Sequence, residues 1–275
     1  MNSNTTLRRI VVTGSNKGIG YEIVGKLLAS TTPYQVVLTA RNPSLGEKAV
    51  ESLRVKYPQS AGKVIFQQLD VNDEKSISSF ADWIKATFGK IDVLVNNAGV
   101  GLPNSTEEDK KFIIKTNFLS LIKLTDKLLP LLSEDGKILM ISSALGGLDI
   151  QGETLRKALE DPSLDLTKLL QVANNFLELS KDFNPPFPHI TDAAYPGSKA
   201  LLNTYVKRFL PQQLGANQQL YAICPGWCKT DLGSDYAPLT AADGADTPVY
   251  LIDLPFKKDS EINGKFITER KVRGW

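Results

Sequence analysis

The feature that most constrains this 275-residue chain is an alternation of short apolar runs with helical stretches through its first 145 residues. The runs are rich in Val, Ile and Leu, which is typical of strands buried on both faces of a sheet. The expected strands cover residues 9–13, 35–39, 63–69, 91–95 and 137–141, and the expected helices cover 18–30, 45–56, 74–88 and 107–132. Because right-handed crossovers join successive parallel strands, the alternation predicts an α/β fold with a doubly wound parallel sheet of the Rossmann type, flanked by helices.

Residues 147–192 interrupt this alternation. Apolar residues at helical spacing from Leu166 to Leu177 predict a mostly helical insertion, and the prolines of 184–188 predict a rigid loop after it. The alternation resumes with a helix at 193–214, a strand at 220–224, a helix at 241–254 and a short strand near 265–268. We therefore expect a single domain over residues 1–275 that carries a helical insertion.

Charge and composition exclude several kinds of protein. The chain has 32 basic and 30 acidic residues, a net charge of +2 that is too balanced for a nucleic-acid or membrane surface. No apolar run approaches the roughly 20 residues needed to cross a bilayer, and the polar start of the chain shows no secretion signal. Cys224, Cys228 and the single His189 are too few for a zinc site, so we expect no metal and a reducing, cytoplasmic compartment.

A glycine-rich loop at residues 13–20, TGSNKGIG, follows the first expected strand and opens the first expected helix. Gly14 permits a tight turn, Gly18 lets the backbone approach a pyrophosphate, and Gly20 allows close packing of helix and strand. The phosphates would lie at the positive end of the helix. A plain tight turn is the alternative. The predicted dinucleotide contacts in this loop are Gly14, Asn16, Lys17, Gly18, Ile19 and Gly20.

The residues after the second expected strand select between NADH and NADPH. An NAD site usually places an acid there, on the ribose 2′-hydroxyl, whereas this chain has Arg41 and no acid. Arg41 and Lys17 could pair with a 2′-phosphate, or each could be an ordinary surface cation. Together with the missing acid, they favour NADPH. Asp70, with Val71 beside it, could contact the adenine, or Asp70 could cap the helix that follows.

Tyr195 and Lys199 are four residues apart, which predicts two side chains on one helix face. An ammonium group lowers the pKa of a nearby phenol from its usual value near 10, and such a phenol is a good general acid for a developing alkoxide. A surface lysine beside a half-buried tyrosine is the alternative. Because proline is tolerated only in a first turn, Pro196 predicts that the helix starts near Asp192 or Ala193, with Asp192 as its cap.

In their order and on their elements, these motifs resemble those of the short-chain dehydrogenase/reductase family. The match comprises the glycine loop, Asn96-Asn97-Ala98-Gly99 after the fourth strand, Ser143 after the fifth, the pair Tyr195 and Lys199, and Pro225-Gly226 after the sixth. Ser143 and Tyr195 are much farther apart than is usual in the family. This long gap, together with the residues of 224–227, 244–251 and 264–266, is similar to the monomeric, NADPH-dependent carbonyl reductases of that family.

The resemblance implies hydride transfer between NADPH and a carbonyl carbon. Tyr195 would give the proton, Lys199 would hold down the pKa of Tyr195 and bind the nicotinamide ribose, and Ser143 would donate to the substrate oxygen. Ser143 is preferred to Ser142 because of its spacing to Gly146. Neighbouring strand residues point to opposite faces, so only one of the two serines can face the cofactor.

Further residues take roles from the same resemblance. Asn117 would hold a water that relays protons to Lys199, or it is a solvent-facing residue. Trp227 could wall the substrate pocket, or it is a packed loop residue. Cys224 is expected to be buried and inert. The remaining expected cofactor contacts are Asn97, Ala98, Gly99, Pro225, Gly226 and Thr230.

The chain is thus predicted to be an NADPH-dependent reductase of a small-molecule carbonyl, an aldehyde, ketone or quinone. The insertion would cover the surface that other family members use to form tetramers, which implies a monomer, and it could also shape the substrate pocket. Two alternatives stay open: a dedicated alcohol or steroid dehydrogenase, and a regulator that binds NADP(H) without catalysis.

Overall fold

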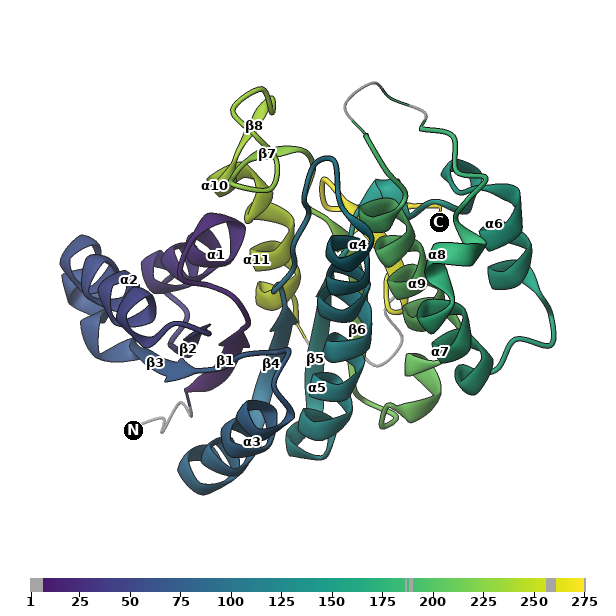
Figure 1. The fold of residues 1–275 in the computed structure, drawn as a ribbon. Coiled ribbons are helices and arrows are strands. Elements are labelled where there is room, and N and C mark those ends of the chain that lie inside the picture. Colours follow the sequence, from purple (N-terminus) through teal and green to yellow (C-terminus); the bar gives the residue numbers. More distant parts are fainter. Residues whose placement is uncertain (1–6, 186, 188–189, 256–260, 275) are drawn as a thin grey trace.

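The computed structural model describes residues 7–185, 187, 190–255 and 261–274 (Figure 1). Its centre is an eight-stranded sheet in the order β10-β9-β6-β5-β4-β1-β2-β3, with helices on both faces. Every neighbouring pair is parallel except β9 and β10. The expected doubly wound α/β fold is therefore confirmed. His189 and two prolines of the expected rigid loop, Pro186 and Pro188, lie outside the described residues.

The strands agree closely with the apolar runs of the sequence. They are β1 Arg8–Val12, β2 Tyr34–Ala40, β3 Val64–Gln68, β4 Ile91–Asn96, β5 Leu132–Ile141, β6 Gln219–Cys224, β9 Lys265–Thr268 and β10 Lys271–Arg273, with a separate short pair, β7 Cys228–Lys229 and β8 Leu239–Thr240. The α-helices are α1 Gly18–Ala29, α2 Pro43–Lys56, α3 Glu74–Phe88, α4 Glu107–Ile114, α5 Ser120–Leu128, α6 Glu153–Glu160, α7 Leu166–Asn174, α8 Phe176–Leu179, α9 Ala194–Arg208, α10 Ala241–Gly244 and α11 Asp246–Asp253. Among the described residues, no helix combines the length and apolarity that a membrane crossing requires.

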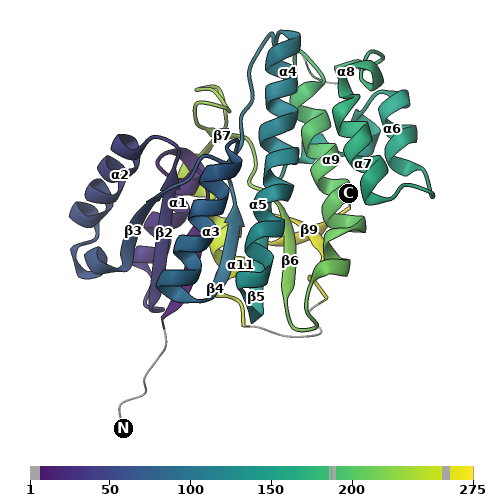
Figure 2. The same cartoon turned by 60° about the horizontal axis from the view of Figure 1, so that its bottom comes forward.

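Two apolar cores lie on opposite faces of the sheet. Helices α1, α2 and α11 pack on one face, and α3, α5 and α9 pack on the other (Figures 1 and 2). Successive strand residues point to opposite faces. Val11 therefore belongs to the core on the face of α3, α5 and α9, whereas its neighbours Ile10 and Val12 belong to the core on the face of α1, α2 and α11.

The expected helix at 107–132 is divided in the structure. A wide π turn, Lys115–Leu119, separates α4 from α5, and in it the Ser120 N–H donates to the Lys115 carbonyl. The prediction that the helix reaches residue 132 is wrong. A short 3₁₀ turn that contains Pro130 follows α5, and β5 begins at Leu132. Wide turns of this kind are rare and often occur at functional sites.

The insertion is mostly helical, as expected, and its helices α6, α7 and α8 lie outside α9, at the opposite end of the sheet from α2 (Figure 2). Buried apolar residues of α6 and α7 share a core with α9, and two further contacts attach the insertion to that helix. A methyl group placed on Gly197 would lie 2.2 Å from Phe176 Cε2, so the ring packs directly on the α9 backbone. Arg208 donates hydrogen bonds to the carbonyls of Leu159 and Asp161 at 3.1 and 3.0 Å, and to that of Leu164 at 3.1 Å.

Candidate active site

The predicted site residues gather at the carboxyl edge of the sheet. Strand β1 pairs with β2 on one side and with β4 on the other, so the chain reverses its direction of winding between β1 and β4. Ligands of doubly wound sheets bind at such a reversal. The glycine loop follows β1, and Asn97 follows β4.

Three glycines give the loop after β1 its conformation. Gly14 and Gly18 have φ angles of +58° and +59°, which residues with a side chain rarely adopt. A methyl group on Gly20 would lie 2.5 Å from Asn97 Nδ2. The Asn97 Nδ2 donates to the carbonyls of Thr13 and Gly14 at 2.9 and 3.1 Å. Asn97 therefore ties the end of β4 to the glycine loop.

Small hydroxyl side chains at the ends of β1 and β2 also hold the glycine loop. Thr13 Oγ1 accepts from the backbone N–H groups of Asn97 and Ala98, both at 2.9 Å. Thr39 Oγ1 accepts from the Gly14 N–H at 3.2 Å, and Ser15 Oγ accepts from the Thr39 N–H at 3.1 Å. The sequence did not single out these hydroxyls. Their signal was a short polar residue at or just after the end of an apolar strand.

The N-terminus of α1 is open to an anion. Lys17 is its N-cap residue, but no side chain caps the first turn and that turn contains no acid. Helix N-terminal N–H groups without a capping partner attract phosphate. The ammonium of Lys17 forms an ion pair with Asp231, and both side chains are largely exposed.

Arg41 and Asp70 lie at the ends of neighbouring strands. The Arg41 side chain is exposed, and within the described part of the chain its guanidinium forms no ion pair. Asp70 accepts from the Asn72 N–H at 2.9 Å and does not cap α3. That helix is capped by Asp73, which accepts from the Lys75 N–H at 3.0 Å. The Asp70 carboxylate thus braces the loop after β3.

Tyr195, Lys199 and Ser143 come together beside this edge. Lys199 is 5% exposed, its Nζ donates to the Ile141 carbonyl at 2.9 Å, and it lies 5.6 Å from the centroid of the Tyr195 ring. The Ser143 hydroxyl lies near enough to the Tyr195 phenol to act against the rise of its pKa. The hydroxyl of Ser142 points elsewhere and donates to Asn203 Oδ1 at 2.6 Å. Only Ser143 is therefore placed beside the phenol.

The start of α9 follows from its proline. The helix begins at Ala194, and the Asp192 carboxylate accepts from the Ala194 N–H at 2.8 Å. Pro196 then falls in the first turn, where backbone N–H groups have no helical partner. The expected start of the helix is confirmed to within two residues, but the N-cap residue is Ala193 and not the expected Asp192.

Burial dominates the ionisation of the pair. It raises the pKa of Tyr195 above its usual value, with a smaller effect in the same direction from Cys224, while the nearby Ser143 hydroxyl works against it. Burial also lowers the pKa of Lys199 to about 8. The expected lowering of the phenol pKa is therefore wrong for the protein by itself, because burial outweighs it. The phenol is protonated at neutral pH.

Asn117 lies in the wide turn between α4 and α5 and is fully buried, so it is not a solvent-facing residue. Its Oδ1 accepts from the Val100 N–H, and its Nδ2 donates to the Val100 carbonyl, both at 2.8 Å. The Nδ2 also donates to Ser198 Oγ at 3.0 Å. Both ends of the amide are thus used by protein groups, and they join the loop after β4 to α9.

The loop after β6 covers the glycine loop. A methyl group on Gly18 would lie 3.4 Å from Thr230 Cγ2, and one on Gly101 would lie 3.2 Å from Tyr195 Cδ2 and 3.3 Å from Leu232 Cγ. Leu232, which the sequence did not single out, therefore lies close to Tyr195. Trp227 is 42% exposed, and its Nε1 donates to the Gly233 carbonyl at 2.5 Å.

Both cysteines of the chain are buried. Cys224 and Cys228 are 8% and 3% exposed, and neither forms a disulfide. Burial raises the pKa of Cys228 to about 11, so this thiol is protonated at neutral pH. Its Sγ donates to the Pro225 carbonyl at 3.4 Å, which makes it part of the turn after β6.

Comparison with known proteins places the chain in a family and agrees with the fold. A family model for short chain dehydrogenases matches residues 8–155. The carbonyl reductase [NADPH] 1 of Sus scrofa is 33% identical over the whole of this chain and 96% of its own length. The solved structure of salutaridine reductase from Papaver somniferum is 32% identical, with a TM-score of 0.81 over 94% of this chain and 99% of that one. The menthone neomenthol reductase from Mentha piperita is 28% identical, with a TM-score of 0.79 over 97% of this chain and 100% of that one.

Proposed function

Because this chain belongs to the short chain dehydrogenase family of oxidoreductases, we propose that it reduces a small-molecule carbonyl to an alcohol with NADPH. The substrate class is an aldehyde, a ketone or a quinone. The observation that carries the proposal is the convergence of Ser143, Tyr195 and Lys199 beside the glycine loop. The name of the Sus scrofa relative, a carbonyl reductase that uses NADPH, supports the same reaction.

The cofactor site fits a dinucleotide. The open N-terminus of α1, with positive φ angles at Gly14 and Gly18, leaves backbone N–H groups for the pyrophosphate. Asp70 and Val71 would contact the adenine. The nicotinamide end would meet Tyr195 and Lys199. The other proposed contacts are Asn16, Lys17, Ile19, Gly20, Arg41, Asn97, Ala98, Gly99, Pro225, Gly226 and Thr230.

The selection of NADPH over NADH would come from two cations. The exposed Arg41 guanidinium stands at the end of β2, where an NAD site has an acid. Lys17 is the second cation, but its present partner, Asp231, would compete with a 2′-phosphate for the ammonium group. A guanidinium binds phosphate through two parallel hydrogen bonds, so Arg41 is the stronger candidate.

The residues around Tyr195 suit proton donation. When bound, NADPH supplies the hydride that reaches the carbonyl carbon. Ser143 would donate a hydrogen bond to the carbonyl oxygen, and Tyr195 would give that oxygen its proton. The Lys199 ammonium would favour the phenolate left behind and hold the ribose hydroxyls. Asn117 would hold the loop after β4 in its position beside Lys199, and it could present a water to the Lys199 ammonium.

Direction and catalysis separate this proposal from its alternatives. A phenol whose pKa is raised by burial stays protonated at neutral pH, which suits a donor in reduction better than a base in alcohol oxidation. A silent NADP(H)-binding regulator would have no need for Ser143, Lys199 and a buried Asn117 around that phenol. Leu232, which lies close to Tyr195, and Trp227 in the same loop are both partly exposed, and they would form apolar walls for the substrate.

The proposal is tested by steady-state turnover of a panel of aldehydes, ketones and quinones, with the matching alcohols assayed in reverse. We expect carbonyl reduction with NADPH, at a kcat/KM well above that with NADH. Arg41→Asp should move the preference toward NADH. Equal use of NADH by the unmodified chain would contradict the cofactor assignment, and turnover of alcohols alone would favour the dedicated dehydrogenase.

The insertion supports a monomer. Its helices cover the outer face of α9 through Phe176 and Arg208, and this covered face is no longer free to meet a second copy. Light scattering of the purified protein should give a mass near 30.2 kDa. A stable tetramer would contradict this.

A further inference from the structure

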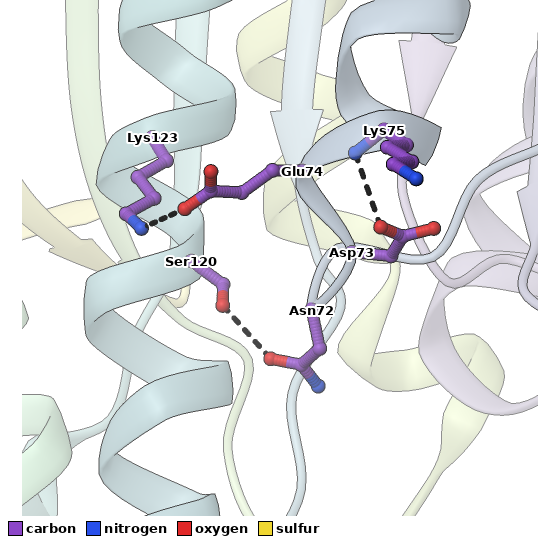
Figure 3. Close-up of polar contacts among 6 residues, drawn as sticks. All are labelled: Asn72, Asp73, Glu74, Lys75, Ser120 and Lys123. Carbon is purple, nitrogen blue, oxygen red and sulfur yellow. Dashed lines mark hydrogen bonds and ion pairs between the residues drawn. The ribbon is translucent and has the colours of Figure 1, made fainter.

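Asn72, in the loop between β3 and α3, joins that loop to the helix pair that carries Asn117 (Figure 3). Its Oδ1 accepts a hydrogen bond from the Ser120 hydroxyl at 2.8 Å, and its Nδ2 donates to the Thr116 hydroxyl at 2.9 Å. Its backbone N–H donates to Asp70 Oδ1 at 2.9 Å. Asn72 is therefore hydrogen-bonded both to Asp70, which is proposed to bind the adenine, and to the wide turn between α4 and α5.

The two hydroxyls that Asn72 holds bracket the wide turn. Thr116 lies within it, and the Ser120 N–H makes the hydrogen bond to Lys115 that closes it. Thr116 and Ser120 are each 4% exposed, so water has little access to replace Asn72 as their partner. A buried polar group that loses its partner is strongly unfavourable. The two hydrogen bonds of Asn72 therefore help to hold the wide turn, a geometry that is rare within helices.

What the wide turn holds in place is Asn117. The amide of Asn117 binds the Val100 backbone on one side and Ser198 Oγ on the other. Ser198 lies on α9 between Tyr195 and Lys199, and its hydroxyl donates to the Tyr195 carbonyl at 2.7 Å. A shift of the turn would therefore reach α9 through one buried side chain.

We infer that Asn72 is a positioning residue, which couples the loop at the adenine end to Asn117 and, through it, to Ser198 and the Tyr195–Lys199 pair. The kinetic part of this inference rests on the proposed function. Asn72 touches neither Tyr195 nor Lys199, so its effect on the reaction is exerted through the wide turn. Binding at the adenine end and proton donation are then linked by hydrogen bonds within the protein.

A second link between the same helices provides a matched control. Glu74, at the start of α3, forms an ion pair with Lys123 on α5, close to Asn72 (Figure 3). Both side chains are mostly exposed, at 74% and 59%. Exposed ion pairs contribute little. Loss of the Glu74–Lys123 ion pair should therefore leave the wide turn unchanged, although Glu74 is close to Asn72 in the sequence and Lys123 is close to Ser120.

The experiment compares three variants of the full chain. Asn72→Leu keeps the approximate volume but makes no hydrogen bonds. Asn72→Asp can accept from both hydroxyls, because each can turn its proton toward the carboxylate. Glu74→Gln is the control. Two readouts are taken: kcat and the KM for NADPH with one carbonyl substrate, and amide hydrogen exchange of the protein without cofactor.

We expect Asn72→Leu to lower kcat about tenfold, more than it raises the KM for NADPH. Exchange should become faster at residues 115–120 and around Ser198. Asn72→Asp should keep kcat within about threefold of the unmodified protein, and Glu74→Gln should change neither readout. If Asn72→Leu does not fold, Ser120→Ala removes one of the two hydrogen bonds and should shift both readouts in the same direction.

Two results would overturn the inference. A raised KM for NADPH with an unchanged kcat would limit Asn72 to the adenine loop. Lower thermal stability with unchanged kcat and unchanged exchange at the wide turn would make it a structural residue only. If the unmodified chain reduces no carbonyl with NADPH, the proposed function fails. The exchange comparison then still decides whether Asn72 holds the turn.

Discussion

The loops of the cofactor end and the helices of the insertion are held in place in different ways. At the cofactor end, Thr13, Thr39 and Asn97 hold backbone groups of neighbouring loops through short hydrogen bonds. The insertion is held on α9 by an apolar core that includes Leu159, Leu169 and Phe176, and by the guanidinium of Arg208. Polar contacts to backbone groups fix the first region, whereas mainly apolar packing fixes the second.

The two regions also differ in what brings their contacts together. The hydroxyls and amides of the cofactor end lie at or just after strand ends, and the parallel sheet brings those ends together. The insertion has no such frame, so its position depends on side chains that fill or bridge gaps on α9. In both regions a glycine makes the contact possible: Gly20 leaves room for Asn97, and Gly197 leaves room for Phe176.

Among the changes that compare the two regions, Gly20→Ala has the largest expected effect. The new methyl group would lie 2.5 Å from Asn97 Nδ2 and 2.9 Å from Ser15 Cα. Overpacking of this kind costs about 1–3 kcal/mol, so we expect the Kd for NADPH to rise about tenfold to hundredfold. Fluorescence titration with NADPH measures this. Gly62→Ala is the control, because a methyl group there meets no atom within 4 Å. An unchanged Kd would mean that the loop yields at Gly20.

Gly197→Ala tests the insertion side. Its methyl group would lie 2.2 Å from Phe176 Cε2, within the turn that separates Tyr195 from Lys199. We expect kcat to fall about tenfold through displacement of α9, with a smaller change in the Kd for NADPH. The double variant Phe176→Leu with Gly197→Ala should recover part of the loss, which a mutant cycle measures. Additive losses would show that the ring and the glycine act independently.

The pH dependence of reduction should follow Lys199. Its pKa is lowered to about 8 by burial, so it carries its charge below that pH and loses it above. Because the raised pKa keeps Tyr195 protonated over this range, kcat/KM should be flat near neutrality and fall up to about tenfold per pH unit above 8. Lys199→Arg, which stays charged, should remove this decline at a lower overall rate. A decline that begins only near pH 10 would contradict the assignment.

The smallest expected effect concerns Asp231, which pairs with Lys17 on the exposed rim of the cofactor end. Asp231→Asn frees Lys17 for a 2′-phosphate. Because exposed pairs contribute at most about 1 kcal/mol, the Kd for NADPH should fall about two- to fivefold at low salt. The Kd for NADH should change less, and the gain should shrink at higher ionic strength. A weaker affinity for NADPH would mean that the pair holds the loop after β6 in its binding position.

The sequence could predict residues placed by the ends of strands, but not properties that depend on how distant segments pack. The glycine loop, Arg41 and Asn97 follow strands that their apolar runs identify, so their meeting at one edge could be foreseen. Ser143 was preferred to Ser142 because of its spacing to Gly146, whereas the alternation of strand residues showed only that one of the two serines can face the cofactor. The phenol pKa was predicted in the wrong direction. Spacing shows that Lys199 is near Tyr195, but not that Lys199 is buried beside a partly buried Tyr195.

Contacts between distant segments escaped the sequence. Nothing in the local pattern around Asn72 indicates that Thr116 and Ser120 will meet it, since that depends on how α3 packs beside α5. The wide turn at Lys115–Leu119 breaks a regular apolar period without a proline or glycine to mark it. The antiparallel strand β10 is short, exposed and polar, so it lacks the apolar run that identifies a buried strand.

The assignment of Tyr195 as the proton donor is tested most directly by Tyr195→Phe, which removes the hydroxyl and keeps the ring. NADPH oxidation in the presence of a good carbonyl substrate is measured beside NADPH binding. We predict that kcat falls by at least about a hundredfold, while the Kd for NADPH stays within a few-fold of the unmodified protein. Turnover that survives the loss of this hydroxyl would contradict Tyr195 as the proton donor.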